Sequence, residues 1–215
     1  MNNIIISNSC VGQFIIKEKN IFPYNNPFIG SLIPNDDEYL KLVNNFNDYI
    51  NAPIKLGEPK KDSLFAIQSK KIYYNHQLVK IPYPIIYLGD IEIHFIHEDD
   101  EIECLNKFNR RIERMKDIIK NKKYKIIFTL SYSEFFNDHN NIKEKIDEYF
   151  SNNLNNNLII EKYFIGSPRY NNGNINYINI DKWKNVRLFR NSSHVYRFND
   201  QLFSIDIFLN KINFL

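Results

Sequence analysis

Cysteine and glycine are scarce in this chain of 215 residues, which has two Cys and six Gly. The two cysteines, Cys10 and Cys104, are too few for a disulfide-stabilised scaffold and are typical of reduced thiols in a cytosolic protein. The few glycines form no glycine-rich phosphate loop. No apolar run approaches the roughly 18 residues of a membrane-spanning helix, and the N-terminal segment lacks the basic start of a signal peptide. We therefore expect a cytoplasmic protein without a transmembrane segment.

An excess of charge of one sign is also lacking, because 28 Lys and Arg face 25 Asp and Glu, for a net charge of +3. This balance gives no reason to expect a nucleic-acid partner. Hydrophobic residues make up 43% of the chain and charged residues 25%, as in ordinary globular proteins. A chain of this length buries enough surface to fold without a metal or disulfide. We predict one domain over residues 1–215.

Strand and helix patterns alternate along the chain. Near-continuous apolar runs predict strands at 4–7, 124–130 and 158–164, and runs of this kind are typical of central strands covered on both faces. Short β-rich runs between 64 and 95, with a turn at Gly89-Asp90, predict antiparallel pairing. Together these patterns predict a layered α/β domain with a mixed, largely parallel sheet and an antiparallel section.

Apolar residues at helical spacing predict helices at 11–19 and 142–150 and a further one near 202–212. Asn35 and Glu38 form a capping-box pattern ahead of a helix whose apolar stripe runs from Tyr39 to Ile50. The clearest helix follows Asp99 or Asp100, either of which is a suitable N-cap. We expect its apolar face to consist of Ile102, Leu105, Phe108, Ile112, Met115 and Ile119.

The first candidate site follows the first predicted strand, at Ser7, Asn8, Ser9 and Cys10. In α/β folds ligands bind beyond the carboxyl ends of strands, where the next helix begins and favours anions. Ser7, Asn8 and Ser9 could hold a phosphate or a sugar hydroxyl, and a Cys at a helix N-terminus can be reactive. The alternative is structural: Ser9 caps the helix and Cys10 is a buried filler.

A second candidate is His97 at the end of a predicted strand, where it could act as a base oriented by Asp99. Alternatively, Asp99 caps the following helix, or both residues lie in a solvated loop. Because alternation puts His94 and His97 on opposite faces of a continuous strand, the two do not form a metal pair.

A third candidate consists of basic and hydroxyl side chains elsewhere in the chain. Arg110 and Arg111 on the long helix could bind a phosphate or carboxylate, or form surface ion pairs instead. The loop after the strand at 124–130 adds Ser131, and the loop after 158–164 adds Ser167 and Arg169.

Three sequence blocks resemble a bacterial family with a domain of unknown function that is associated with exopolysaccharide biosynthesis. The blocks are IISNSCVG at 5–12, YNNPF at 24–28, and YLGDIEIHFIH at 87–97 followed by FNRRI at 108–112. The resemblance covers about 4–169. It implies a three-layer α/β/α fold and a setting among polysaccharide genes, and it adds Asn26 to the candidate substrate-binding residues. Members often carry an acidic pair after the strand that ends here at Leu130. That pair is missing, so we expect no metal there.

A more distant similarity is to a group of papain-like cysteine peptidases, which have a Cys after the first strand and a His ahead of a helix with paired arginines. These observations lead to three hypotheses. The first is a cytosolic enzyme that transfers or modifies a sugar in the biosynthesis of surface polysaccharide, with an activated sugar donor and a glycan acceptor as partners. The second is a thiol hydrolase or acyltransferase with Cys10 as nucleophile and His97 as base. The third is a non-catalytic glycan-binding or assembly protein. The residues specify no cofactor.

Overall fold

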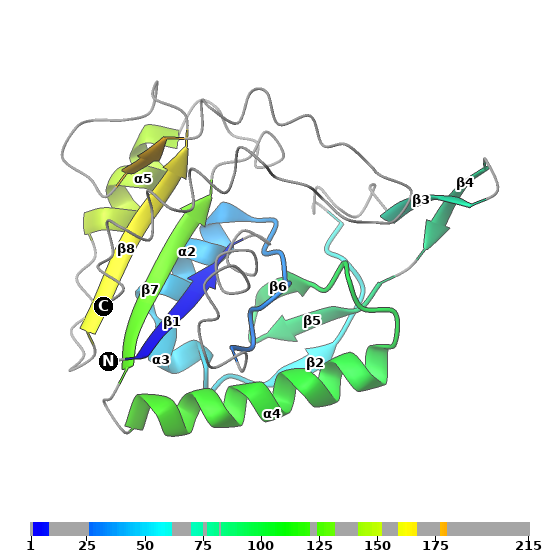
Figure 1. Ribbon diagram of the computed structural model, residues 1–215, viewed down its shortest axis with the longest axis horizontal. Coiled ribbons are helices and arrows are strands. Elements are labelled where there is room, and N and C mark those ends of the chain that lie inside the picture. Colours follow the sequence, from blue (N-terminus) through cyan, green and yellow to red (C-terminus); the bar gives the residue numbers. More distant parts are fainter. Residues whose placement is uncertain are drawn as a thin grey trace.

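The computed structural model describes residues 2–8, 26–61, 70–74, 77–81, 83–120, 124–131, 142–151, 159–166 and 177–179. Within them the chain forms a mixed α/β fold, as predicted (Figure 1). The strands are β1 (Asn2–Ser7), β2 (Ile54–Leu56), β3 (Lys70–Tyr74), β4 (Gln77–Ile81), β5 (Ile85–Leu88), β6 (Ile91–His94), β7 (Tyr124–Ser131), β8 (Ile159–Gly166) and β9 (Tyr177–Asn179). The helices are α2 (Asp36–Asn44), α3 (Phe46–Tyr49), α4 (Glu101–Lys120) and α5 (Ile142–Ser151).

A parallel sheet with the order β1-β7-β8-β9 carries the three predicted apolar strands. Ile6 pairs with Phe128 in register, and Phe128 pairs with Lys162. One face, with Ile4 and Ile126, belongs to the main hydrophobic core. On the other face Ile5 and Ile127 are also buried. Burial on both faces explains why these strands lack the alternation of a half-exposed sheet. Among the described strands β7 and β8 are interior, whereas β1, expected to be central, lies at the end of the order.

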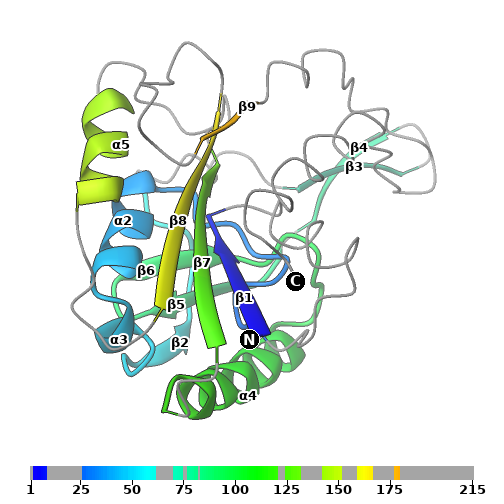
Figure 2. The ribbon, with the colours of Figure 1, turned by 60° about the vertical axis from the view of Figure 1, so that its left-hand side comes forward.

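The antiparallel strands form sheets of their own, which corrects the expectation of one mixed sheet. β2, β5 and β6 make a three-stranded sheet, and β3 with β4 makes a separate hairpin. The β5–β6 turn is as predicted, and Gly89 in it has the positive φ of 64° that glycine tolerates. Apolar residues of both larger sheets and of α2 and α4 belong to one hydrophobic core, and Figure 2 shows the two sheets as separate units with α4 running along the ends of both.

The helices present the apolar stripes that their spacing predicts, with one error. Asn35 caps α2, because its side chain accepts hydrogen bonds from the backbone N–H of Asp37 at 2.9 Å and of Glu38 at 3.3 Å. In α4, however, Ile102 is 63% exposed, and Cys104 takes its place in the core. Cys104 is four residues before Phe108 and therefore shares its helix face, whereas Ile102 does not.

The described helices α2, α4 and α5 all contribute to the core on one side of the parallel sheet. The second helical layer would come from 11–19 and 202–212, which lie outside the described residues. The prediction of a single domain over 1–215 also reaches beyond the described residues and stays a prediction.

Candidate functional site

The polar residues at the end of β1 are buried. Ser7 is 2% exposed, Asn8 0% and Asn26 3%. Asn26 serves as a structural tie, since its amide nitrogen donates to the carbonyl oxygen of Ile5 and its amide oxygen accepts from the backbone N–H of Phe28 at 2.9 Å. The carbonyl oxygen of Asn8 accepts from the N–H of Ile33 at 2.9 Å. The segment 26–33 is therefore fixed against the carboxyl end of β1. Ser9 and Cys10 lie outside the described residues.

His97 and Asp99 are both exposed and follow the end of β6. One mixed sheet, as predicted, would place His97 after a strand of the same sheet as β1. That placement is wrong, because β6 belongs to the separate antiparallel sheet. The N-cap interaction of α4 comes from Asp100, whose side chain accepts from the N–H of Glu103 at 2.8 Å. The assignment of His97 and Asp99 as catalytic residues stays a prediction.

Arg110 and Arg111 lie on α4, which passes the amino ends of β1 and β7 (Figures 1 and 2). Arg110 is exposed and Arg111 half-buried, and burial lowers the pKa of the Arg111 guanidinium. Ser7 and Asn8, in contrast, lie at the carboxyl end of β1. A donor site combining these arginines with the end of β1 is therefore not formed by the described residues. Ser131 ends β7.

Ser167 and Arg169 lie outside the described residues, so the predictions for their loop stay predictions.

A carboxylate, an imidazole and a phenol form a buried relay next to β6. Nε2 of His94 lies 2.5 Å from Oε1 of Glu92, and Nδ1 of His94 lies 2.9 Å from the hydroxyl of Tyr83. His94 is 0% exposed and Glu92 1% exposed, while Tyr83 is half-buried. Burial, with a smaller effect of the Glu92 charge, raises the pKa of Tyr83 to about 12. A protonated Tyr83 can donate to Nδ1 while Nε2–H of a neutral His94 donates to Glu92.

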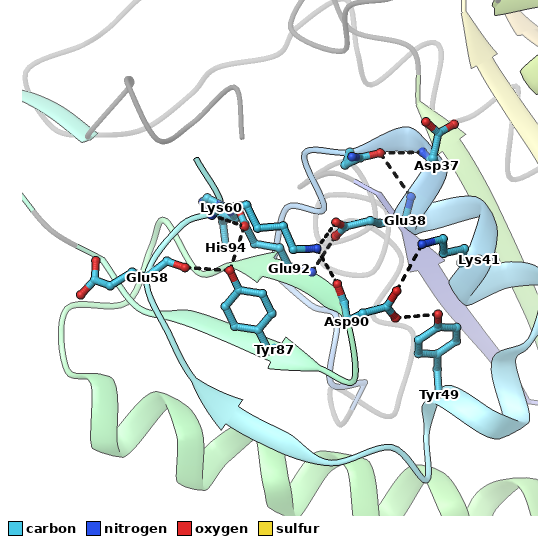
Figure 3. A network of polar contacts seen from close by, with 11 residues as sticks. Asp37, Glu38, Lys41, Tyr49, Glu58, Lys60, Tyr87, Asp90, Glu92 and His94 are labelled. Carbon is cyan, nitrogen blue, oxygen red and sulfur yellow. Dashed lines mark hydrogen bonds and ion pairs between the residues drawn. The ribbon is translucent and has the colours of Figure 1, made fainter. Parts of the chain in front are cut away.

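Lys60 and Glu38 join Glu92 and His94 of this relay in a larger network, and Figure 3 shows these four residues. The backbone N–H of Lys60 donates to Oε2 of Glu92 at 2.6 Å, and its ammonium group donates to Oε1 of Glu38 and, at 2.6 Å, to the carbonyl of Asp90. Oε2 of Glu38 accepts from the N–H of Glu92 at 2.7 Å. Glu38 therefore does not reach back to Asn35, and only half of the predicted capping box forms. Buried carboxylates need such partners, because leaving a charge unpaired in the interior is costly.

Sequence reasoning missed His94 and Glu92 because it weighed His94 only as a partner for His97. A usable signal was present. Two ionisable residues two positions apart in an apolar strand lie on one face, and β6 is buried along its whole length. Tyr83 and Lys60 carry no such signal, since only the fold brings them to the strand.

A second candidate lies where α2 begins, at the carboxyl edge of the parallel sheet. The hydroxyl of Tyr39 lies 2.9 Å from the carbonyl oxygens of both Ile6 and Thr129, and so holds the first turn of α2 to β1 and β7. In that turn, burial raises the pKa of Asp36 to about 6, against the opposing charge of Lys145. Within the described residues, Oδ1 of Asp36 is buried without a hydrogen-bond partner. A carboxyl group that titrates near neutral pH is suited to proton transfer.

Comparison with known proteins places the chain in a family. A family model described as "Domain of unknown function (DUF1919)" matches residues 2–203, and the chain belongs to that family. A protein of Haemophilus influenzae named "Uncharacterized protein" is 30% identical over 112 residues, which cover 52% of this chain and 44% of that protein. The chain thus spans less than half the length of this curated relative. No solved structure matches the chain. Membership of a family with a domain of unknown function is confirmed, while the exopolysaccharide setting and the peptidase similarity stay predictions.

In the described part of the chain, none of the helices has the length and apolar character needed to cross a membrane. The same residues contain no group of three His, Cys, Asp or Glu side chains placed to hold a metal ion.

Proposed function

We propose that this protein is a cytosolic enzyme of surface-polysaccharide biosynthesis that transfers a sugar from an activated donor to a glycan hydroxyl. Support for the setting comes from the sequence blocks that resemble exopolysaccharide proteins. Support for the chemistry comes from one observation, the Glu92–His94–Tyr83 relay. Such a relay suits general acid–base catalysis on a hydroxyl group. In this proposal His94 takes the role first given to His97.

The relay would act on the acceptor. As the acceptor oxygen bonds to the anomeric carbon of the donor, its proton passes to the hydroxyl oxygen of Tyr83, and the proton of Tyr83 passes to Nδ1 of His94. The bond between the anomeric carbon and the donor phosphate breaks, and its electron pair leaves with the phosphate. The adjacent carboxylate of Glu92 stabilises the imidazolium that forms, as a carboxylate does for the imidazolium in other acid–base relays.

The test starts with a panel of nucleotide sugars, with binding followed by ligand-observed NMR and transfer to glycan acceptors followed by mass spectrometry. We expect Tyr83→Phe and His94→Gln to lower turnover by about 10²–10⁴-fold while donor binding is kept. Tyr87→Phe is the matched control, because the Tyr87 hydroxyl also contacts Glu92, at 3.1 Å, but on Oε2 and away from His94. Full turnover in Tyr83→Phe, or no donor bound from the panel, would refute the proposal.

A thiol hydrolase or acyltransferase acting on glycans is the second candidate, because the backbone brings the end of β1 towards His94. The segment whose Ile33 N–H donates to the carbonyl oxygen of Asn8 also pairs with β6, since the N–H and C=O groups of Leu32 and His94 bond to each other at 2.9 and 2.8 Å. Cys10 follows Asn8 by two residues. In this alternative, iodoacetamide at about pH 6 labels Cys10 rapidly, and Cys10→Ser removes nearly all hydrolysis.

If the protein binds glycans without catalysis, the same panel gives a different result. Binding is then unaffected by His94→Gln, and no product forms with any donor.

A further inference from the structure

The backbone around Tyr83 holds this residue beside His94. Pro84 follows Tyr83, and a residue that precedes proline is restricted to extended conformations. The carbonyl oxygen of Pro84, which is buried, accepts from the N–H of Phe95 at 2.9 Å. Ile85 then pairs in register with His94. The centroids of the Tyr83 and His94 rings lie 5.5 Å apart. The hydroxyl of Tyr83 therefore meets the imidazole without any rearrangement of the backbone.

Tyr83, His94 and Glu92 stand in the order of a nucleophile, a base and an orienting acid. The Tyr83 hydroxyl lies 2.9 Å from Nδ1 of His94, and Oε1 of Glu92 lies 2.5 Å from Nε2. A hydroxyl group becomes a nucleophile when a neighbouring base takes its proton, and a third group orients that base. Burial raises the pKa of Tyr83 to about 12, so the phenol keeps its proton until it attacks.

The carboxylate of Glu92 is fixed for this role from its other side. Its Oε2 accepts from the backbone N–H of Lys60 at 2.6 Å and from the hydroxyl of Tyr87 at 3.1 Å. These two donors fix the carboxylate plane and leave Oε1 directed at His94. The orienting acid is thus held in place by groups that take no part in the proton transfer.

Tyr83 is also the member of the relay that an incoming molecule can reach. His94 and Glu92 are buried, whereas Tyr83 is half-buried. The oxygen atom in direct contact with the base is therefore the phenol oxygen of Tyr83. An acceptor hydroxyl would reach His94 only through Tyr83, so Tyr83 is placed to compete with that acceptor.

We propose that Tyr83 is itself a sugar acceptor, and that its hydroxyl takes the sugar of a nucleotide-sugar donor when no glycan is bound. The phenol oxygen bonds to the anomeric carbon while its proton passes to Nδ1 of His94. The bond between the anomeric carbon and the donor phosphate breaks, and its electron pair leaves with the phosphate. Glu92 stabilises the imidazolium that forms. This inference rests on the proposed sugar transfer, because both reactions use the same donor.

The test is incubation of the full-length protein with each nucleotide sugar of the panel, without any glycan, followed by mass spectrometry of the intact protein. We expect a mass gain of one sugar residue, which tandem mass spectrometry should place on Tyr83. The gain should be absent in Tyr83→Phe and form at least about 100-fold more slowly in His94→Gln. Tyr87 is the internal control, because its hydroxyl donates to the carbonyl of Glu58 at 2.7 Å and contacts Glu92 directly. It should carry no sugar.

An aryl sulfonyl fluoride tests the activation of Tyr83 without a sugar donor. The phenol oxygen bonds to sulfur, fluoride leaves with the electron pair of the S–F bond, and the phenol proton passes to His94. In the folded protein we expect Tyr83 to be labelled about 100-fold faster than Tyr87. In urea the two tyrosines should react at similar rates. This comparison uses the unsubstituted protein, so it does not depend on the folding of His94→Gln.

The outcomes separate this inference from the proposed function. Transfer to a glycan without a sugar on Tyr83 overturns the inference and leaves the proposed function standing. A sugar on Tyr83 without transfer to any glycan supports the inference and overturns the proposed transfer to a glycan. Equal labelling of Tyr83 and Tyr87 by the sulfonyl fluoride in the folded protein, or no product with any donor, overturns the inference.

Discussion

Loss of the Lys60 ammonium group should destabilise the protein far more than loss of a comparable surface lysine. In Lys60→Met the aliphatic stem remains, but Glu38, whose side chain is 7% exposed, loses its cation. Removing one partner of a buried ion pair costs about 3–5 kcal/mol. Because the Lys60 side chain is 34% exposed, solvent reduces the effect, and we expect about 2–3 kcal/mol.

The matched control is Lys41→Met. Lys41 contacts Asp90 at 3.2 Å, but their side chains are 53% and 60% exposed. Exposed pairs of this kind contribute little, so the expected loss is below about 0.5 kcal/mol. Both lysines contact Asp90, and both variants remove one positive charge. A difference in unfolding free energy between the two variants therefore reflects the burial of the ion pair and not the change in net charge.

A double-mutant cycle with Glu38→Gln isolates the pair. In a protein that carries Glu38→Gln, Lys60→Met no longer leaves a buried charge without its partner. Lys60→Met should then lower the free energy of unfolding by about 1–2 kcal/mol less than it does in the unsubstituted protein. The free energy of unfolding comes from urea denaturation, with an unchanged dependence on urea concentration as the check for two-state behaviour. The coupling should persist at about 1 M salt, where an exposed pair is screened. A coupling energy near zero, or equal losses in Lys60→Met and Lys41→Met, would falsify the argument.

Three further predictions concern α2 and α4. Tyr39→Phe should lower the free energy of unfolding, measured by urea denaturation, by about 1–2 kcal/mol, because two strand carbonyls lose a buried donor. The control Tyr49→Phe removes a hydroxyl bonded to an exposed carboxylate at 2.8 Å and should lower it by less than about 0.5 kcal/mol. Equal losses in the two variants would contradict this prediction. The pKa of Asp36 rises from 3.8 to about 6 on folding, so its contribution to stability is complete below about pH 4 and falls as pH rises to about 6. Asp36→Asn should therefore flatten that part of the plot of unfolding free energy against pH and stabilise the protein by about 2 kcal/mol at neutral pH. An unchanged slope in that plot would refute this prediction. Burial raises the pKa of the Cys104 thiol to about 12, so iodoacetamide should alkylate Cys104 much more slowly in the folded protein than in urea. Peptide mass spectrometry measures both rates, and equal rates would be inconsistent with the burial of Cys104.

The features that could be predicted from the sequence are those that depend on residues close together in the chain. The turn at Gly89 and Asp90, the cap at Asn35 and the strand at 124–130 depend on short-range chemistry and on apolar periodicity, and all three are confirmed. Asn8 was found because it follows a predicted strand, and Asn26 was found through the family resemblance. Their burial and the backbone carbonyl that binds Asn26 are consequences of packing, so sequence patterns left their roles open.

Pattern alone determined that this is an α/β protein with three apolar strands and a long amphipathic helix, because burial on one or both faces sets the spacing of apolar residues. Tertiary structure decided which polar residues meet. Glu38 on α2, Lys60 after β2 and Tyr83 before β5 converge on Glu92 and His94 of β6. These contacts join residues up to 54 positions apart, and no local spacing encodes them. The physical reason is that each buried carboxylate must find donors wherever the packed chain places them.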